Sequence, residues 1–542
     1  MPSITIADFA GMSTALSPKV LKDNIATYAQ NCKVGDGKLR PMRGAQAVSP
    51  NPLHSAPETI YEYIPGKWFE FSEDVDVAPV PNAFDNTNKV IYTGDSYPRI
   101  TRDDVALSAS GAMPLDSYRL GLPVPTNVIT GVVAGTPEEN ALDDYRSYFY
   151  TWVDAWGEES APGYTSETMN VKEGQTVTLT IPAAPTGDYN FGTGAVKRIY
   201  RSNSGSAATA YQFVADIGIS ATTFVDTIVD AALGEVCPTI NWLRPPDDDT
   251  ADFPTGQMLG ATTLPSGAIV GFSGSTLVYS EAYIPYAYPL DYRYHIKAEI
   301  VGVSPNSQGL LVATKGKPHL AVGHDPASVT IIELDEYQAC VSKRSVVDMG
   351  ESTLYASPDG LVMVQGNQVT VATEAIFTRE QWQALNPEQI HAYRYEGKYI
   401  GFTDTTGFVF DPASTEQAWI FTDLAANCGH YVPREDALYV AVNSTLKQWD
   451  EGDELMYTWI SKVFQSPTPV NMGALKVECT GIVQVHVIGD GVTRATVICD
   501  GDTLVRLPAG YRAQEWQLKL VGSAHVDFVK LGTSIKELNS GE

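Results

Sequence analysis

The sequence is poor in basic residues, and this limits its partners. Its 542 residues include 36 Lys and Arg against 64 Asp and Glu, which leaves a net charge of −28. Because affinity for phosphate backbones comes from cations that neutralise them, this balance excludes non-specific wrapping of nucleic acid. An anionic membrane surface would repel the chain for the same reason. With 44% hydrophobic and only 18% charged residues, the chain can still fill sizeable cores and is not disordered.

Cysteine is also sparse, and long apolar runs are missing. The six cysteines include no CxxC pair, and Cys428-Gly429-His430 has no second pair to complete a tetrahedral zinc site. No stretch approaches the roughly 18 apolar residues of a membrane helix, so we predict no membrane-spanning segment. The first residues lack a basic region and an apolar core, so no signal peptide is expected. We predict reduced, mostly buried thiols made in a cytoplasm, although Cys479 and Cys499 could meet across a hairpin.

Motifs for catalysis are missing as well. The chain contains no HExxH, GxxxxGK[ST] or GxSxG pattern. Glycoside hydrolysis needs only two carboxylates, and candidate pairs lie in the segment 333–336 and at Asp411 with Glu416. Because chance pairs are expected among 64 acids, we predict no enzyme activity, no catalytic residue, no metal and no cofactor. A β-propeller that binds or hydrolyses polysaccharide on a host surface is the alternative.

Alternation of apolar and polar residues is the main pattern that is present. The segments 177–181 and 483–487 alternate as half-buried strands do, and Gly, Asn and Asp turns separate such runs. Helix signals are few: a segment that opens with Ser17-Pro18 and extends to Tyr28, a capping box over 378–381, and a turn over 386–389. The sequence therefore predicts a mainly β fold.

The length and the rhythm of the strands predict several domains. At roughly 150 residues each, three or four domains are expected. Short strands without a Cys…Trp…Cys pattern favour a fibronectin- or immunoglobulin-like sandwich, and strand pairs repeated every few tens of residues favour a β-propeller. We predict an N-terminal segment contributing to the propeller (1–120), an inserted Ig/fibronectin III-like β-sandwich (121–245), the main part of the β-propeller (246–465) and a small C-terminal β module (466–542).

An acidic run follows the predicted sandwich and is the first candidate site. Such a run could attract calcium, but it lacks the spaced carboxylates and the glycine of an EF-hand loop. A flexible acidic hinge is the better interpretation. Its members are Asp247, Asp248, Asp249 and Asp252.

A tyrosine-rich segment is the second candidate site. Its rings could stack on sugars or bases, but the interleaved Ile284, Pro285, Pro289 and Leu290 favour packing in a core or an interface. The candidate interface residues are Tyr283, Tyr286, Tyr288 and Tyr292.

Short motifs spread over most of the chain occur in a fixed order. They lie at residues 31–33 with 37–44, 198–202, 272–274 with 279–285, 324–328, 338–345, 355–362, and 377–382 with 385–387. Together they resemble the tail nozzle proteins of short-tailed bacteriophages, also called tail tubular protein B. The resemblance implies a β-propeller with inserted β modules, six copies in a ring below the portal and the adaptor, and a central passage for DNA. It implies no catalytic residues.

The resemblance also implies partners and a location. The partners would be further copies of the chain, the head-to-tail adaptor protein, and tail fibres or spikes; double-stranded DNA would pass without specific binding. The protein would belong to the virion tail and be made in the host cytoplasm. An acidic wall would repel the duplex and let it slide, so part of the −28 charge, with the loop at Asp247–Asp252, is expected to line the channel. The alternative is that the acids only confer solubility before assembly.

A closed ring of this kind needs two different complementary patches on each subunit. The tyrosine-rich segment and the inserted sandwich are the predicted patches, or the docking sites for fibres. Replacing Tyr286, Tyr288 and Tyr292 with alanine is expected to weaken ring formation.

Overall fold

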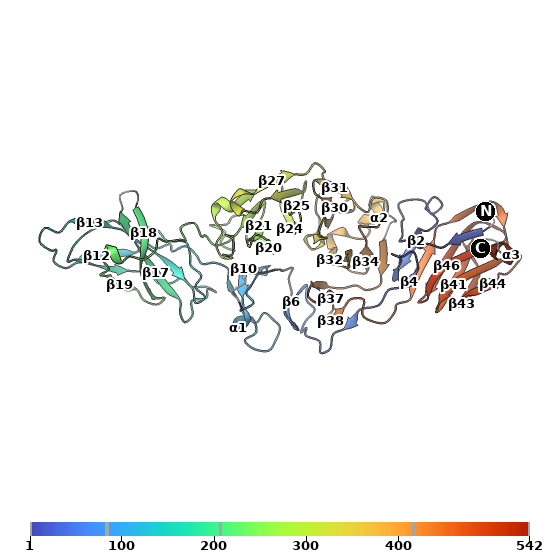
Figure 1. The fold of residues 1–542 in the computed structure, drawn as a ribbon, viewed down its shortest axis with the longest axis horizontal. Helices are drawn as coiled ribbons and strands as arrows, with labels where there is room; N and C mark the ends of the chain where they lie inside the picture. Colours follow the sequence, from blue (N-terminus) through green and yellow to red (C-terminus); the bar gives the residue numbers. More distant parts are fainter. Residues whose placement is uncertain (1–2, 82–85, 205–208, 415–418, 540–542) are drawn as a thin grey trace. The chain divides into compact units, whose positions relative to one another are not determined.

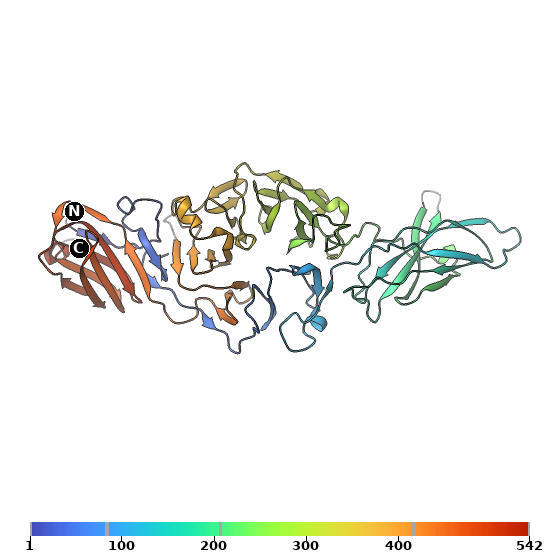
Figure 2. The ribbon, with the colours of Figure 1, turned by 180° about the vertical axis from the view of Figure 1, so that it is seen from behind.

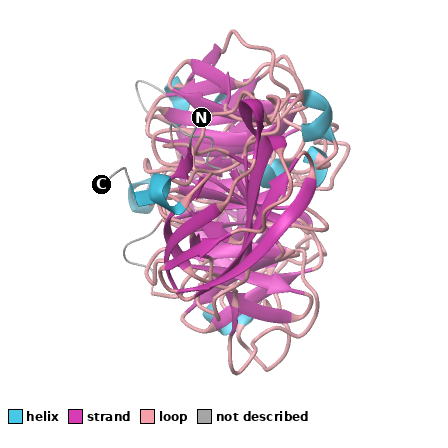
Figure 3. Ribbon diagram, turned by 90° about the vertical axis from the view of Figure 1, so that its right-hand side faces the viewer, coloured by secondary structure: helices cyan, strands magenta, loops and turns pink. Residues whose placement is uncertain are grey.

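The computed structural model describes residues 3–81, 86–204, 209–414 and 419–539. Strands dominate, and the α-helices among these residues have only four or five residues each: α1 (Asp103–Ala106), α2 (Arg379–Gln383) and α3 (Ile535–Asn539) (Figure 3). This confirms the predicted mainly β class. The chain divides into two compact units: unit 1 comprises 1–74, 301–322 and 331–542, and unit 2 comprises 75–300 and 323–330.

The largest sheet of unit 1 joins strands from both ends of the chain. Its order is β32 (His391–Tyr395), β33 (Lys398–Phe402), β34 (Gly407–Phe410), β35 (Trp419–Thr422), β2 (Ala26–Gln30), β39 (Tyr457–Ser461), β45 (Ala513–Gly522), β42 (Ile482–Gly489) and β43 (Val492–Asp500), with β40 (Phe464–Val470) beside β45. A second sheet has the order β1 (Ser3–Ile6), β46 (His525–Gly532), β41 (Ala474–Thr480) and β44 (Thr503–Arg506). The C-terminal strands therefore share their sheets with β1 and β2, and β1 pairs with β46 (Figures 1 and 2).

The remaining sheets of unit 1 are small, and most of them follow the chain order. They are β28 (Val347–Asp348), β29 (Thr353–Ala356), β30 (Leu361–Gln365) and β31 (Gln368–Val371); β36 (Cys428–Val432), β37 (Ala437–Val442), β38 (Thr445–Gln448) and β5 (Gln46–Ala47); β3 (Cys32–Lys33) and β4 (Arg40–Pro41); and β6 (Thr59–Ile64) and β7 (Lys67–Phe71). A further sheet has the order β24 (Ile300–Asn306), β25 (Gly309–Thr314), β26 (His319–Val322) and β27 (Thr330–Glu333).

Unit 2 contains two four-stranded sheets and an inserted segment. One sheet comprises β8 (Asp76–Pro79), β9 (Val90–Gly94), β10 (Ser96–Thr101) and β11 (Tyr118–Arg119), and the other comprises β20 (Leu259–Thr263), β21 (Ile269–Ser273), β22 (Thr276–Tyr279) and β23 (Arg293–His295). The chain between them, 121–245, is called the inserted segment below. Its sheets are β12 (Thr130–Ala134), β16 (Thr176–Thr180) and β19 (Thr223–Asp226); β14 (Tyr148–Val153), β17 (Val196–Ser204) and β18 (Thr209–Gly218); and β13 (Asp143–Arg146) with β15 (Met169–Lys172).

The inserted segment has a core of its own. Val177 and Leu179 of β16 pack in one cluster with Tyr148, Tyr150 and Trp152 of β14, so two three-stranded sheets share this core. β14 is buried along its whole length, as a strand that packs on both faces must be. The strands group together in both views (Figures 1 and 2).

The predicted short helices show where a local sequence signal decides the structure and where a long-range contact does. Thr378 accepts a hydrogen bond from the Gln381 backbone, and the full capping box starts α2 as predicted. The predicted turn follows as a 3₁₀ helix, Pro387–Gln389. The helix predicted from Ser17 to Tyr28 is wrong: residues 17–25 form turns, and Tyr28 lies in β2. Pairing of β2 with β39 buries Ala26 and Ala29, and this burial outweighs a weak local helix signal.

The cysteines behave as the sequence predicts. All six lie among the described residues, and each is a buried free thiol. Cys479 and Cys499 are therefore not joined. Burial raises the pKa of Cys32 and Cys340 to about 12, so these thiols stay protonated and unreactive at neutral pH.

Candidate functional site at the base of the inserted segment

The four candidate tyrosines lie in unit 2 but differ in exposure. Tyr283 is 63% exposed, and its ring covers Gly267, where an added Cβ would meet the ring at 2.5 Å. Tyr286 and Tyr292 are half-buried, and burial together with the Glu281 carboxylate raises the pKa of Tyr292 to about 12. Tyr288 is fully buried. As an interface candidate Tyr288 is wrong, because its ring packs in the core between the two four-stranded sheets of this unit.

Conservative substitution of Tyr288 tests this assignment. Its hydroxyl is buried and has no hydrogen-bond partner among the described residues. Because an unpaired buried hydroxyl costs free energy, Tyr288→Phe is expected to raise the free energy of unfolding by about 1 kcal/mol. Tyr288→Ala is expected to lower it by about 3–5 kcal/mol through the cavity it leaves. Urea denaturation measures both; a Tyr288→Ala variant as stable as the unmodified chain would contradict the core assignment, and a strongly destabilised Tyr288→Phe would show that the hydroxyl has a partner.

The acidic run is an ordered, ion-paired turn. The Arg244 guanidinium lies 3.2 Å from Asp247, 3.1 Å from Asp249 and 2.9 Å from Asp252. Asp248 accepts a 2.7 Å hydrogen bond from Arg119, and this bond lowers the pKa of Asp248. The flexible hinge predicted from Asp247, Asp248, Asp249 and Asp252 is therefore corrected: two guanidinium groups cross-link the four carboxylates. Four acids against two arginines still leave an acidic surface here.

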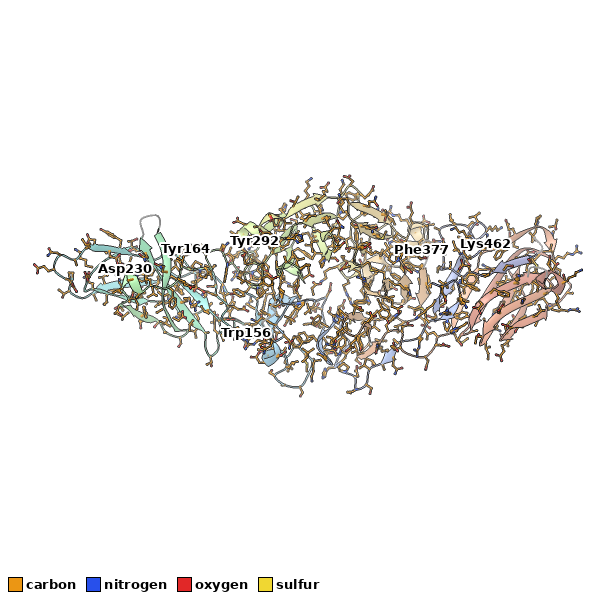
Figure 4. The ribbon with its side chains drawn as sticks, viewed as in Figure 1. Trp156, Tyr164, Asp230, Tyr292, Phe377 and Lys462 are labelled. Atoms are coloured by element: carbon orange, nitrogen blue, oxygen red, sulfur yellow. The ribbon has the colours of Figure 1, made fainter. Side chains whose placement is uncertain are left out.

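The inserted segment meets the sheet that contains β10 through a tryptophan, Trp156. Trp156, which is labelled in Figure 4, packs edge-on against Tyr118, and the two ring centroids are 5.3 Å apart. The Arg102 guanidinium lies 4.4 Å from the centre of the Trp156 ring, and Lys89 Nζ lies 5.1 Å from it. Lys89 precedes β9 and Arg102 follows β10, so the ends of neighbouring strands place two cations on one indole, a stabilising arrangement.

Buried carboxylates surround this tryptophan. Asp154, Glu158 and Glu159 are each 5% exposed. Glu158 lies 3.1 Å from Lys89 Nζ, while Glu159 accepts hydrogen bonds from Tyr200 and Arg198, each at 2.8 Å. No sequence motif marks this cluster, which we call the junction cluster (Asp154, Trp156, Glu158 and Lys89). The only signal was acids directly after a fully buried strand.

Asp154 is the member of the junction cluster whose pKa lies near neutral pH. Burial, and then the charge of Glu158, raise the pKa of Asp154 to about 7. One carboxyl oxygen accepts hydrogen bonds from the backbone N–H groups of Trp156 and Glu158, both at 2.8 Å. The base of the inserted segment therefore contains a carboxyl group whose charge changes near neutral pH.

A second buried ion pair holds the inserted segment together internally. Arg201 and Asp226 are both fully buried, and their Nη1 and Oδ2 atoms are 2.6 Å apart. Asp226 also accepts a 2.8 Å hydrogen bond from the Tyr148 hydroxyl. Nη2 of Arg201 lies 2.6 Å from Asp230, a residue labelled in Figure 4. The Asp230 side chain is 55% exposed. This network joins β14, β17 and β19 across the core.

Motifs that are distant in the sequence meet in unit 1. The Ser357 hydroxyl donates to the Gln338 side chain at 2.9 Å, and the Trp382 indole N–H donates to the Ser357 carbonyl at 2.8 Å. Asp359 lies 3.2 Å from Arg379 and accepts from the Gln338 amide at 3.3 Å. Residues from 338–345, 355–362 and 377–382 therefore form one hydrogen-bonded cluster, which we call the motif cluster.

No group of three or more metal-ligating side chains occurs among the described residues, and Glu416, half of one candidate carboxylate pair, lies outside them. Within the described part of the chain, no helix has the length and apolar character to cross a membrane.

Comparisons with known proteins give no assignment. No protein family and no curated protein matches the chain. The AfRom2 CNH domain aligns at 9% identity with a TM-score of 0.22, over 59% of this chain and 93% of its own. The extracellular domain of a one-component system from B. thetaiotaomicron aligns at 10% identity with a TM-score of 0.18, over 95% and 93%. The extracellular domain described as that of a hybrid two-component system from the same organism aligns at 9% identity with a TM-score of 0.20, over 94% of this chain and 86% of its own. At such scores these likenesses support no functional statement.

Proposed function

We propose that this chain is a structural subunit of a virion, the tail nozzle of a short-tailed bacteriophage. The observation that best supports the proposal is the motif cluster. Three of the motifs on which the resemblance rests form it together, through Gln338, Ser357 and Trp382. Segments that share one packing site have a common structural reason to occur together, which accidental short matches would not have.

The strand order supports the finer architecture that we propose. Four-stranded sheets in sequential order, such as β20 to β23 and β28 to β31, are the form of propeller blades. We propose that sheets of this form are blades of a β-propeller. The inserted segment, with two three-stranded sheets around one core, is proposed to be the Ig/fibronectin III-like sandwich.

In this proposal six copies form a ring below the adaptor, and the inserted segment or the Tyr283 surface contacts a neighbouring copy or a tail fibre. The net charge of −28 suits a passage that must not bind DNA, because each phosphate contact made by a cation would add affinity and slow the duplex. No catalytic step is part of this function.

The mass of the purified full chain in solution tests the proposal. Sedimentation equilibrium is expected to show a discrete closed oligomer, and Tyr283→Ala is expected to shift it toward monomer. Tyr337→Ala is the matched control, because Tyr337 is 70% exposed but lies outside both proposed patches. A chain that stays monomeric at all concentrations would overturn the proposal, and turnover of polysaccharide by that monomer would favour the alternative function. An oligomer that Tyr283→Ala leaves intact would reject only the Tyr283 patch.

A further inference from the structure

Unit 1 contains a cavity of about 440 Å³ whose wall combines apolar and charged side chains. Its wall includes the buried side chains of Phe9, Ile400 and Trp449, together with the ring of Tyr395. The cavity lies where the chain before β2 meets the hairpins of β33 and β34. A concave site of this size, whose wall combines apolar side chains with charged groups, suits a small molecule that carries both kinds of surface.

The rim of the cavity carries an excess of negative charge. Four carboxylates line it against two lysines. Lys33 pairs with Asp450, and Lys398 lies 3.6 Å from Glu396. Both lysines are therefore already engaged with rim carboxylates, and two carboxylates remain.

The two remaining carboxylates are Asp8 and Asp411. Asp8 accepts a 3.1 Å hydrogen bond from the Asn24 amide, and Asp411 accepts a 3.0 Å hydrogen bond from the Ala413 backbone. Neither has a cationic side chain within ion-pair distance among the described residues. Two carboxylates without a cationic partner among the described residues thus share the cavity wall with apolar and aromatic side chains, and aromatic rings also attract cations.

We propose that this cavity binds a small organic cation with an apolar body, such as an alkyl diamine. The alkyl chain would pack on the apolar side chains of Phe9, Ile400 and Trp449, and the ammonium groups would pair with Asp8 and Asp411. Neutral molecules of the same length would gain only the first of these contributions, and carboxylates would be repelled. The site does not depend on the oligomeric state proposed above.

Calorimetric titration of the purified full chain with hexamethylenediamine tests the proposal. Saturable binding with one site per chain is expected, weakened by added salt, and hexanol and hexanoate are expected to bind at least about tenfold more weakly. Asp8→Asn combined with Asp411→Asn is expected to lower the diamine affinity by at least about tenfold while leaving hexanol binding unchanged. Asp404→Asn, on the exposed turn at the other end of the β33–β34 hairpin, is the matched control and is expected to change nothing.

Thermal unfolding of each variant, monitored by circular dichroism, shows whether a loss of binding comes from a loss of folding. If the double variant does not fold, Asp411→Asn alone serves, with a smaller loss of diamine affinity expected. Three results would overturn the proposal: no saturable diamine binding, equal binding of hexanol and diamine, or a folded asparagine variant that binds diamine like the unmodified chain.

Discussion

Replacing Asp226 with alanine is expected to lower the free energy of unfolding of unit 2 by about 3–5 kcal/mol, because it leaves a fully buried guanidinium without its partner. Arg201 would keep only the exposed Asp230 and the Ile228 carbonyl, and the Tyr148 hydroxyl would lose its acceptor. Urea denaturation followed by intrinsic fluorescence measures the change. The loss should exceed that of any single exposed ion pair in the inserted segment.

Asp143→Ala is the matched control for this prediction. Asp143 lies 3.3 Å from Lys172 in the same segment, but both side chains are more than 40% exposed. Pairs of this kind contribute at most about 1 kcal/mol. Replacing Arg201 and Asp226 together with Met and Leu should restore most of the stability, since no charge is then left buried. If Asp226→Ala costs no more than Asp143→Ala, the buried pair does not hold the three strands together.

The second expected result is that the free energy of unfolding falls between about pH 4 and pH 7. Asp154→Asn is expected to abolish this fall. The pKa of Asp154 is about 7 in the folded chain against 3.8 ordinarily. Below pH 3.8 the carboxyl group is protonated in both states. As pH rises, the unfolded chain releases this proton first, so stability is lost until the pH passes the folded pKa. If the whole shift in the pKa of Asp154 acts on folding, the free energy of unfolding falls by about 4 kcal/mol.

Asparagine keeps the oxygen that accepts the two backbone hydrogen bonds and cannot ionise, so the variant should be more stable than the unmodified chain at pH 8 and similar at pH 4. Asp104→Asn is the control: a hydrogen bond from Arg102 lowers the pKa of Asp104, so this carboxyl group is ionised in both states over most of this window. Urea denaturation at a series of pH values measures all three chains. Parallel curves for Asp154→Asn and the unmodified chain would contradict the assignment of a raised pKa at the junction cluster.

Local signals predicted their elements well, and long-range contacts account for the rest. The capping box at Thr378 needs only residues within one turn, so the sequence sufficed to predict α2. The segment at Ser17 has a similar local signal, but the pairing of Tyr28 with Ile460 decides its structure, and no local pattern reports a partner more than 400 residues away. Class and strand positions were therefore predictable, while the turn at Ser17 was not.

The candidate site shows the same division. The acidic residues of the 247–252 run are evident in the sequence. Their ion pairing, however, depends partly on Arg119, which is 129 residues from Asp248. The tyrosine segment was also visible, yet nothing in its composition separates the buried Tyr288 from the exposed Tyr283. Asp154 has an ordinary local sequence, and its raised pKa arises from burial beside Glu158 after β14 is packed. A sequence shows which residues can carry a charge, but tertiary contacts determine their burial, their ion pairs and their pKa values.

Electron microscopy of the purified full chain, imaged alone without other tail proteins, tests the central claim most directly. The account predicts single closed rings, seen end-on, with a central hole wide enough for a DNA duplex and walls that bear carboxylates rather than lysines or arginines. Isolated monomers, or rings whose bore is lined by basic side chains, would contradict it.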